Sequence, residues 1–269
     1  MRQWPLVIFL ALLSAFSQRP ACASPAAFAD WAAVVVAGDD HAHSGDLTET
    51  FDNARRDVAA ELVRKGFSPG NVLQFSVRPE LYPAAKPLKA DLAPIYDGLR
   101  SLAQRAKGGC LVYFTSHGAP QGVVLDNSLL PPRLMDDMVS TSCGNRPTVV
   151  IISACFSGVF IPALAANNRM IITAARPDRT SFGCGANDRY PYFDACLLQS
   201  LPDAHDFSAL APKVQQCVAS RETELGASPP SEPQVWIGPA LRPVLPLMGF
   251  APASGGASCS SPCQNRVGG

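Results

Sequence analysis

The sequence carries no net charge and no long run of basic residues. Its 269 residues include 22 Lys and Arg and 22 Asp and Glu, so the formal net charge is zero. Proteins that bind nucleic acids present a clustered cationic surface to the phosphates, and this sequence contains no cluster of Lys or Arg that would supply one. The balance of charge therefore argues against a nucleic-acid-binding role.

Closely spaced cysteine pairs and long apolar segments are also missing. No two cysteines have the CxxC spacing that is typical of zinc sites and redox motifs, so we expect no metal centre. Beyond the N-terminal region, no segment reaches the 18 or so apolar residues that a membrane-spanning helix needs. We therefore expect no stable membrane insertion of the mature protein.

The N-terminus has the features of a secretory signal. Arg2 precedes an apolar run over residues 4–16, and Ala21-Cys22-Ala23 places small residues at positions −3 and −1 of a cut after Ala23. A membrane anchor is the weaker interpretation, because a helix of this length rises only about 20 Å. Lipid attachment at Cys22 is a further alternative. We expect residues 1–23 to be a signal peptide and the mature protein to be periplasmic or secreted.

Cysteine usage fits an oxidising compartment, where disulfides form and persist. Eight of the nine cysteines remain after removal of the signal. Their positions in the predicted elements favour Cys110–Cys143 and Cys196–Cys217 bridges, with a Cys259–Cys263 loop in the tail. Cys184 is then left over beside Cys155. A redox or disulfide-handling protein is an alternative that rests on the cysteine count alone.

Apolar segments alternate with amphipathic segments along residues 24–250, which we expect to form one domain. Strands are predicted at residues 31–37, 72–77, 110–115, 148–153, 170–174 and 234–237, and helices at 51–65, 90–106, 194–200 and 207–220. This alternation predicts a three-layer α/β/α fold with a mostly parallel six-stranded sheet. Residues 251–269 are rich in Gly and Ser and are expected to be a flexible tail.

Two neighbouring predicted strands end in turns that carry a histidine and a cysteine. Residues 115–118 read Thr-Ser-His-Gly, and residues 153–158 read Ser-Ala-Cys-Phe-Ser-Gly. Ligands bind at the carboxyl ends of parallel strands, so His117 and Cys155 are predicted to meet at one edge of the sheet. There an imidazole can take the proton of a thiol and create a nucleophile. Each residue alone is more often structural, and the pairing is what favours catalysis.

Glycines follow both residues closely and let bare backbone N–H groups approach a reacting carbonyl. The backbone amides of Gly118 and Cys155 are the candidates for an oxyanion hole.

The segments LVYFTSHG, over residues 111–118, and VVIISACFSG, over residues 149–158, resemble the legumain family of cysteine peptidases, relatives of the caspases. The similarity extends over most of residues 31–240. It implies a caspase-like fold and a cysteine-type endopeptidase with Cys155 as nucleophile and His117 as its partner. Peptide bonds would be cleaved through a thioester acyl-enzyme, with a peptide or protein substrate and no metal or organic cofactor.

The residues expected to line the substrate pocket depart from the legumain pattern in part. Ser153 stands where those enzymes have a substrate-binding glutamate, and Phe51 lies near the position of an arginine. Ser181 and Asp194 match the pattern, so the resemblance makes Ser153, Ser181 and Asp194 candidate substrate-binding residues. A pocket with an acidic floor favours a basic or amide P1 side chain. Asp194 also fits a first-turn acid of a helix.

The polar loop after the first strand offers one more candidate. Asp39 would face His117 and orient its ring, although a turn-forming role is equally compatible with its position. His41 and His43 lie in the same loop and are expected to be solvated. Two other functions stay open: a transpeptidase that uses the same dyad, and a catalytically inactive caspase-fold binding protein, which the altered pocket residues motivate.

Overall fold

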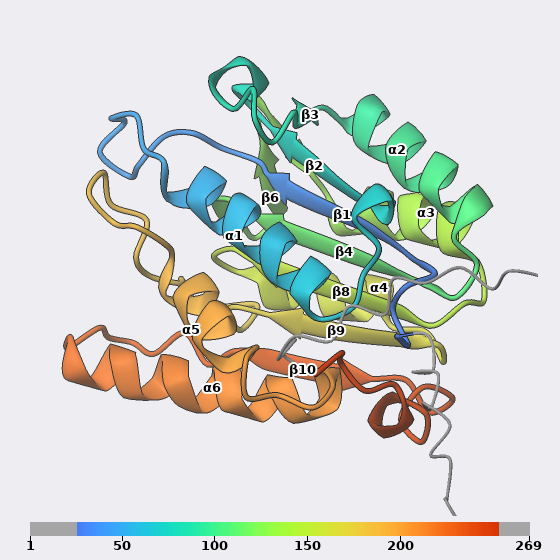
Figure 1. The fold of residues 1–269 in the computed structure, drawn as a ribbon. Helices are drawn as coiled ribbons and strands as arrows, with labels where there is room; N and C mark the ends of the chain where they lie inside the picture. Colours follow the sequence, from blue (N-terminus) through green and yellow to red (C-terminus); the bar gives the residue numbers. More distant parts are fainter. Residues whose placement is uncertain (1–25, 253–269) are drawn as a thin grey trace, which may run out of the picture.

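The computed structural model describes residues 26–252, which form a seven-stranded sheet between two layers of helices (Figure 1). The strand order is β10-β9-β8-β4-β1-β2-β3, and every neighbouring pair is parallel except β9 and β10. The predicted signal peptide, the Cys259–Cys263 bridge and all but the first two residues of the predicted tail lie outside the described residues.

The bounds of the predicted elements agree with the structure to within a few residues, but the helices over residues 132–143 and 161–164 were not predicted. The strands of the main sheet are β1 (Trp31–Ala37), β2 (Val72–Ser76), β3 (Leu88–Lys89), β4 (Gly109–Thr115), β8 (Thr148–Ser153), β9 (Arg169–Thr173) and β10 (Gln234–Ile237). A second sheet contains β5 (Gly118–Ala119), β6 (Gly122–Leu125) and β7 (Ser128–Leu130). The helices are α1 (Thr50–Arg64), α2 (Leu92–Arg105), α3 (Pro132–Cys143), α4 (Ile161–Leu164), α5 (Tyr192–Ser200) and α6 (Phe207–Glu224).

The predicted α/β/α class is confirmed, and the predicted strand count of six is wrong. The seventh strand, β3, has only two residues and follows a proline-rich loop, so it carries no periodic signal. The strands of the second sheet have two to four residues each and were missed for the same reason. The four predicted strands that surround the site do lie in the expected order, β2-β1-β4-β8.

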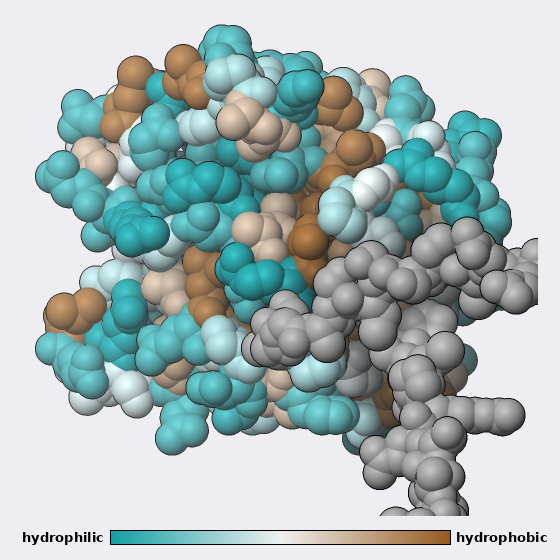
Figure 2. All heavy atoms as spheres, in the orientation of Figure 1, coloured by the Kyte–Doolittle hydropathy of each residue, from teal (hydrophilic) through white to brown (hydrophobic). Residues whose placement is uncertain are grey.

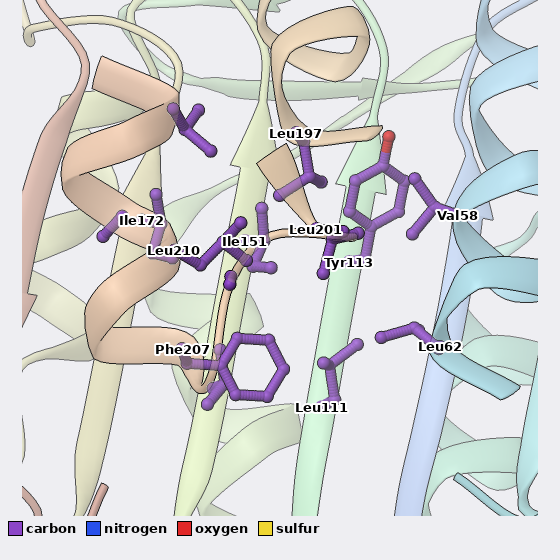
Figure 3. Packing of buried hydrophobic residues seen from close by; sticks show 14 of the residues in the cluster. Val58, Leu62, Leu111, Tyr113, Ile151, Ile172, Leu197, Leu201, Phe207 and Leu210 are labelled. Atoms are coloured by element: carbon purple, nitrogen blue, oxygen red, sulfur yellow. The ribbon is translucent and has the colours of Figure 1, made fainter. Parts of the chain in front are cut away.

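Each central strand is buried on both faces because helices cover both sides of the sheet. Alternate residues of a strand point to opposite faces, so Ala33 and Val35 of β1 pack in one apolar cluster and Val34 and Val36 in another. The first cluster lies under α1, α5 and α6, where Val58, Leu197 and Phe207 close over β4 and β8 (Figure 3); α2 and α3 cover the second.

The outward face of the α1, α5 and α6 layer is mainly hydrophilic (Figure 2). Across residues 26–252, the helices lack the combination of length and apolar character that crossing a bilayer requires.

Two disulfides tie helices to the fold, and both were predicted. Cys110–Cys143 joins β4 to the end of α3, and Cys196–Cys217 joins α5 to α6. Among the described cysteines, Cys155 and Cys184 are free and buried. These bridges are compatible with an exported protein.

A buried ion pair anchors α1 to β2. The Arg55 side chain is fully buried; its Nε donates to Asp52 Oδ1 at 2.6 Å and its Nη1 to Gln74 Oε1 at 2.5 Å. Ser76 Oγ donates to the other oxygen of Asp52 at 3.0 Å. Burial raises the pKa of Asp52 in spite of the Arg55 charge beside it. This pair depends on both partners, because either charge alone would be buried without compensation.

We expect Arg55→Met to lower the free energy of unfolding by about 3–5 kcal/mol, because it leaves Asp52 buried and unpaired. The matched control is Arg56→Met, which removes the next arginine of the same helix. Its partner is Asp57 and its side chain is 46% exposed, so we expect a loss of at most about 1 kcal/mol. Urea unfolding of both variants measures the difference, and equal losses would contradict the role given to Arg55.

Candidate active site

Parallel pairing of β4 with β8 brings the two predicted catalytic residues to one edge of the sheet. Thr115 is paired with Ser153 at the ends of these strands, and Ser116 N donates to Ser153 O at 3.1 Å. His117 follows Thr115 by two residues, and Cys155 follows Ser153 by two. The two turns therefore leave the same rim side by side.

The His117-Gly118 turn packs directly on the backbone of Cys155. A Cβ atom at Gly118 would lie 2.1 Å from Cys155 O and 3.0 Å from Ala154 Cβ, so only glycine fits this close approach. The glycine that sequence analysis singled out is thus the contact point between the two turns.

The turn that carries Cys155 is held in an uncommon conformation. Phe156, the next residue, has φ 57° and ψ 11°, the left-handed region that non-glycine residues rarely adopt. Two hydrogen bonds hold this turn to the segment after β9: Phe156 N donates to Arg179 O at 2.8 Å, and Ala175 N donates to Ser157 Oγ at 3.1 Å. These hydrogen bonds thus fix the position of the backbone that carries the Cys155 side chain.

Cys155 is only 4% exposed, and its sulfur lies against Ser181. Ser181 N donates to Sγ at 3.2 Å, and the Ser181 hydroxyl lies 3.5 Å from the same atom. These contacts with Ser181 help to bury the sulfur.

The ring of His117 is oriented by a backbone carbonyl. Its Nε2 lies 2.9 Å from His41 O, and because a carbonyl oxygen only accepts hydrogen bonds, Nε2 carries the proton. Nδ1 then has the free lone pair. This atom is buried and has no hydrogen-bond partner within residues 26–252, so it is the nitrogen available to accept a proton.

Two aromatic rings contact His117 and reduce its exposure to water. The His43 ring lies 4.6 Å away between centroids, and the Phe51 ring, from the first turn of α1, lies 5.1 Å away in an edge-on arrangement. Burial lowers the pKa of His117, and the nearby His43 and His41 add to this effect; the bond to His41 O and the charge of Asp39 oppose it. The ring is therefore held as a neutral base to lower pH.

His117 and Cys155 share the rim without a hydrogen bond between them. In the part of the chain that the structure describes, the ring bonds only to His41 O, and the sulfur bonds only to Ser181. Catalytic hydrogen bonds are often long in a free enzyme and tighten when substrate binds.

Asp194 lies beneath this rim as a buried acid. It belongs to the first turn of α5 and is 0% exposed. Tyr113 OH donates to its Oδ1 at 2.7 Å and Thr115 Oγ1 to its Oδ2 at 2.6 Å. Burial raises its pKa to about 7, although hydrogen bonds from Thr115, Tyr113 and Ser153 act against the rise. The carboxyl is thus balanced between its two protonation states near neutral pH.

Phe51, Ala37 and Cys184 form a small buried apolar cluster. Burial is the main cause that raises the pKa of the Cys184 thiol, and the nearby Cys155 adds to the rise. Ser153, at the end of β8, is 2% exposed.

Asp39 makes its hydrogen bonds within its own loop. Its Oδ1 accepts from Asp40 N at 2.7 Å and from His41 N at 3.0 Å. Ligand atoms of Asp39, Asp40 and His41 lie within 4.8 Å of one another, but Arg78 pairs with Asp40 at 2.8 Å. These contacts account for the three side chains, and we assign them to holding the loop.

The structure thus brings His117, Cys155 and Ser181 together and places Ser153 and Asp194 below them. Sequence reasoning missed the role of the loop histidines: the His41 carbonyl, and not Asp39, contacts His117, and the His43 ring packs on it. A backbone carbonyl leaves no trace in a sequence, so no signal would have identified it.

Comparison with known proteins identifies the fold and the family of this chain. Caspase-1 from Spodoptera frugiperda has a similar structure, with a TM-score of 0.56 and 16% sequence identity over 80% of this chain and 88% of that chain. At this identity the likeness shows the fold, which is caspase-like. The Peptidase C13 family model matches residues 85–223, just over half of the chain, so the chain belongs to that family of cysteine endopeptidases. A comparison with curated protein sequences found no match.

We expect stability to depend on pH through Asp194. Its pKa of about 7 lies above the ordinary 3.8, so between these values the folded protein holds a proton that the unfolded chain has released. The free energy of unfolding therefore falls as pH rises through this window, by up to roughly 4 kcal/mol. Asp194→Asn imitates the protonated carboxyl and should abolish the fall.

Urea unfolding at about pH 4.5 and about pH 8 tests this expectation. Asp178→Asn is the control, because Asp178 is exposed and flanked by Arg176 and Arg179, and it should keep the pH dependence of the wild type. The assignment fails if Asp194→Asn keeps that dependence as well.

Proposed function

We propose that this protein is an exported endopeptidase that cleaves peptide bonds with a Cys155–His117 dyad. The observation that carries the proposal is the shared rim: His117 and Cys155 follow paired strand ends, and Gly118 packs on the Cys155 backbone. The free lone pair of His117 Nδ1, with Nε2 bound to His41 O, supports a general-base role for this ring.

The reaction follows from these positions. His117 Nδ1 takes the proton of Cys155, and the thiolate attacks the scissile carbonyl carbon. Backbone N–H groups of Gly118 and Cys155 stabilise the oxyanion, and the imidazolium then protonates the leaving amine. Water, activated by the same imidazole, hydrolyses the thioester and restores the free thiol.

Substrate recognition is proposed to involve Ser153, Ser181 and Asp194. Ser153 and Asp194 lie buried below the rim, and Ser181 covers the nucleophile, so a P1 side chain would contact them only after the bound peptide has opened the site. A carboxyl that is balanced between two protonation states suits an amide or basic P1 group, because it accepts a hydrogen bond in either state. A bound peptide would displace the Ser181 segment from the sulfur.

Residues 1–23 are proposed to direct export and to be removed, which leaves residues 24–250 as the peptidase domain. Export to a periplasmic or extracellular location fits the two disulfides and the signal-like N-terminus.

We expect His117→Ala to lower kcat for peptide cleavage by about 10²–10⁴-fold, because the general base is lost. Cys155→Ala should abolish turnover. Fluorogenic peptides with Asn, Asp, Lys or Arg at P1 provide the assay. Cys184→Ala is the matched control, since within residues 26–252 it removes the second free, buried thiol and leaves Cys155 in place.

Two results would contradict the proposal. Undiminished cleavage by Cys155→Ala would show that another group attacks the peptide bond. Failure of the wild type to cleave any member of the panel, together with equal iodoacetamide labelling of Cys155 in the wild type and in His117→Ala, would favour an inactive binding protein of this fold.

A further inference from the structure

The loop between β1 and α1 presents a second histidine to the proposed base. The His43 ring lies 4.6 Å from the His117 ring between centroids, with their planes tilted by 43°. Such a separation is within the range of packed aromatic pairs. His43 is itself exposed, so burial in the core does not explain its position.

The loop is built in a way that fixes His43 over His117. Ala42 N donates to Asp46 O at 2.8 Å and Gly45 N donates to Ala42 O at 2.9 Å, which closes a tight turn with His43 inside it. Gly45 has φ 86°, so the turn uses a left-handed residue. Ser44 Oγ donates to Asp46 Oδ2 at 2.8 Å and ties the side chains of the turn together.

Backbone hydrogen bonds also join the two chain segments at the base of this turn. His41 forms an antiparallel bridge with Leu47, and Thr48 N donates to Asp40 O at 2.9 Å. The same base carries the His41 carbonyl that binds His117 Nε2. One loop therefore supplies both the acceptor that sets the tautomer of His117 and the ring that packs against it.

We propose that His43 is a positioning residue, which holds the His117 ring in its catalytic orientation and shields it from water. The role rests on the proposed Cys155–His117 dyad. Phe51 contacts the same ring from α1, so His43 and Phe51 together restrict its rotation. Without His43, the ring would be fixed by the His41 carbonyl and Phe51 alone.

The electrostatic surroundings give this role a measurable signature. The titratable groups whose charges act on His117 are Asp39, His41 and His43, all from the loop; Cys155 lies on the neighbouring turn, and Phe51 of α1 is uncharged. Burial is the main cause that lowers the pKa of His117, and the charge of His43 acts in the same direction. Loss of the His43 ring removes this charge and reduces the burial, so the base would become protonated at higher pH.

The test compares His43→Ala with His43→Phe, which keeps an aromatic ring of similar size without the charge. We expect His43→Ala to lower kcat by about two- to tenfold, the range that packed aromatic pairs imply, while KM stays nearly unchanged. The acid limb of the kcat profile should move to higher pH. His43→Phe should restore most of kcat and most of the wild-type pH profile, because the ring is shielded again.

The kinetic measurements use the peptide of the P1 panel that the wild type cleaves fastest. Iodoacetamide labelling of Cys155, followed by mass spectrometry, gives a second pH profile between about pH 5 and 9. His205→Ala is the control, since His205 is exposed beside the start of α6, away from the site. Wild-type kcat and pH profile in His43→Ala would overturn the inference, as would an effect on KM alone or a His43→Phe variant as slow as His43→Ala.

His117→Ala separates this outcome from failure of the proposed function. If His117→Ala is inactive while His43→Ala behaves as the wild type, the dyad stands and the role of His43 is wrong. Full activity of His117→Ala would overturn the dyad and the inference that rests on it.

Discussion

The parallel pairing of β4 with β8 is the constraint on which the site depends. Register places Thr115 opposite Ser153, so the residues that follow each strand must leave the sheet at the same rim. Three further features position these two turns. Gly118 allows the turns to touch, and the left-handed Phe156 redirects the chain after Cys155. Hydrogen bonds from the segment after β9 hold the Cys155 turn from the other side. A shift of one residue in the pairing would turn either Thr115 or Ser153 to the opposite face of the sheet and so separate the hydroxyls that contact Asp194.

The loop after β1 completes the rim from the other neighbour of β4. Because β1 is also parallel to β4, its carboxyl end delivers this loop beside His117. The Asp39 side chain was expected to contact His117. It instead accepts hydrogen bonds from the backbone of its own loop, and the His41 carbonyl contacts the imidazole. An ionised partner would favour the imidazolium more strongly than a carbonyl does, so the carbonyl suits the proposed role of this ring as a general base, which requires the neutral form.

On the side of the site where the substrate pocket was expected, Asp194 contributes a buried carboxyl group. Asp194 is surrounded by hydroxyl donors from β4 and β8 and has no cationic partner among the described residues that contact it. Ser153 stands where legumains have a glutamate. A second acid at this position, beside Asp194, would raise the pKa of Asp194 further, whereas the serine does not. The Ser181 contact buries the Cys155 sulfur in the same region, so in the proposed mechanism one segment would affect both substrate recognition and exposure of the nucleophile.

The sequence by itself determined the class of fold, because strands buried on both faces are continuous apolar runs and helices show a period of 3.6. It also determined which strand ends carry His117 and Cys155, and it favoured the two cysteine pairs that the structure contains without fixing them. Only the tertiary structure decided the partner of His117, the contact of His43 with it and the closure of the site by Ser181. These depend on backbone carbonyls, ring stacking and loop geometry, which arise between residues far apart in the chain and leave no periodic pattern. The tertiary structure also decided short strands such as β3, because a strand of two residues forms only when a neighbouring strand is in place to bind it.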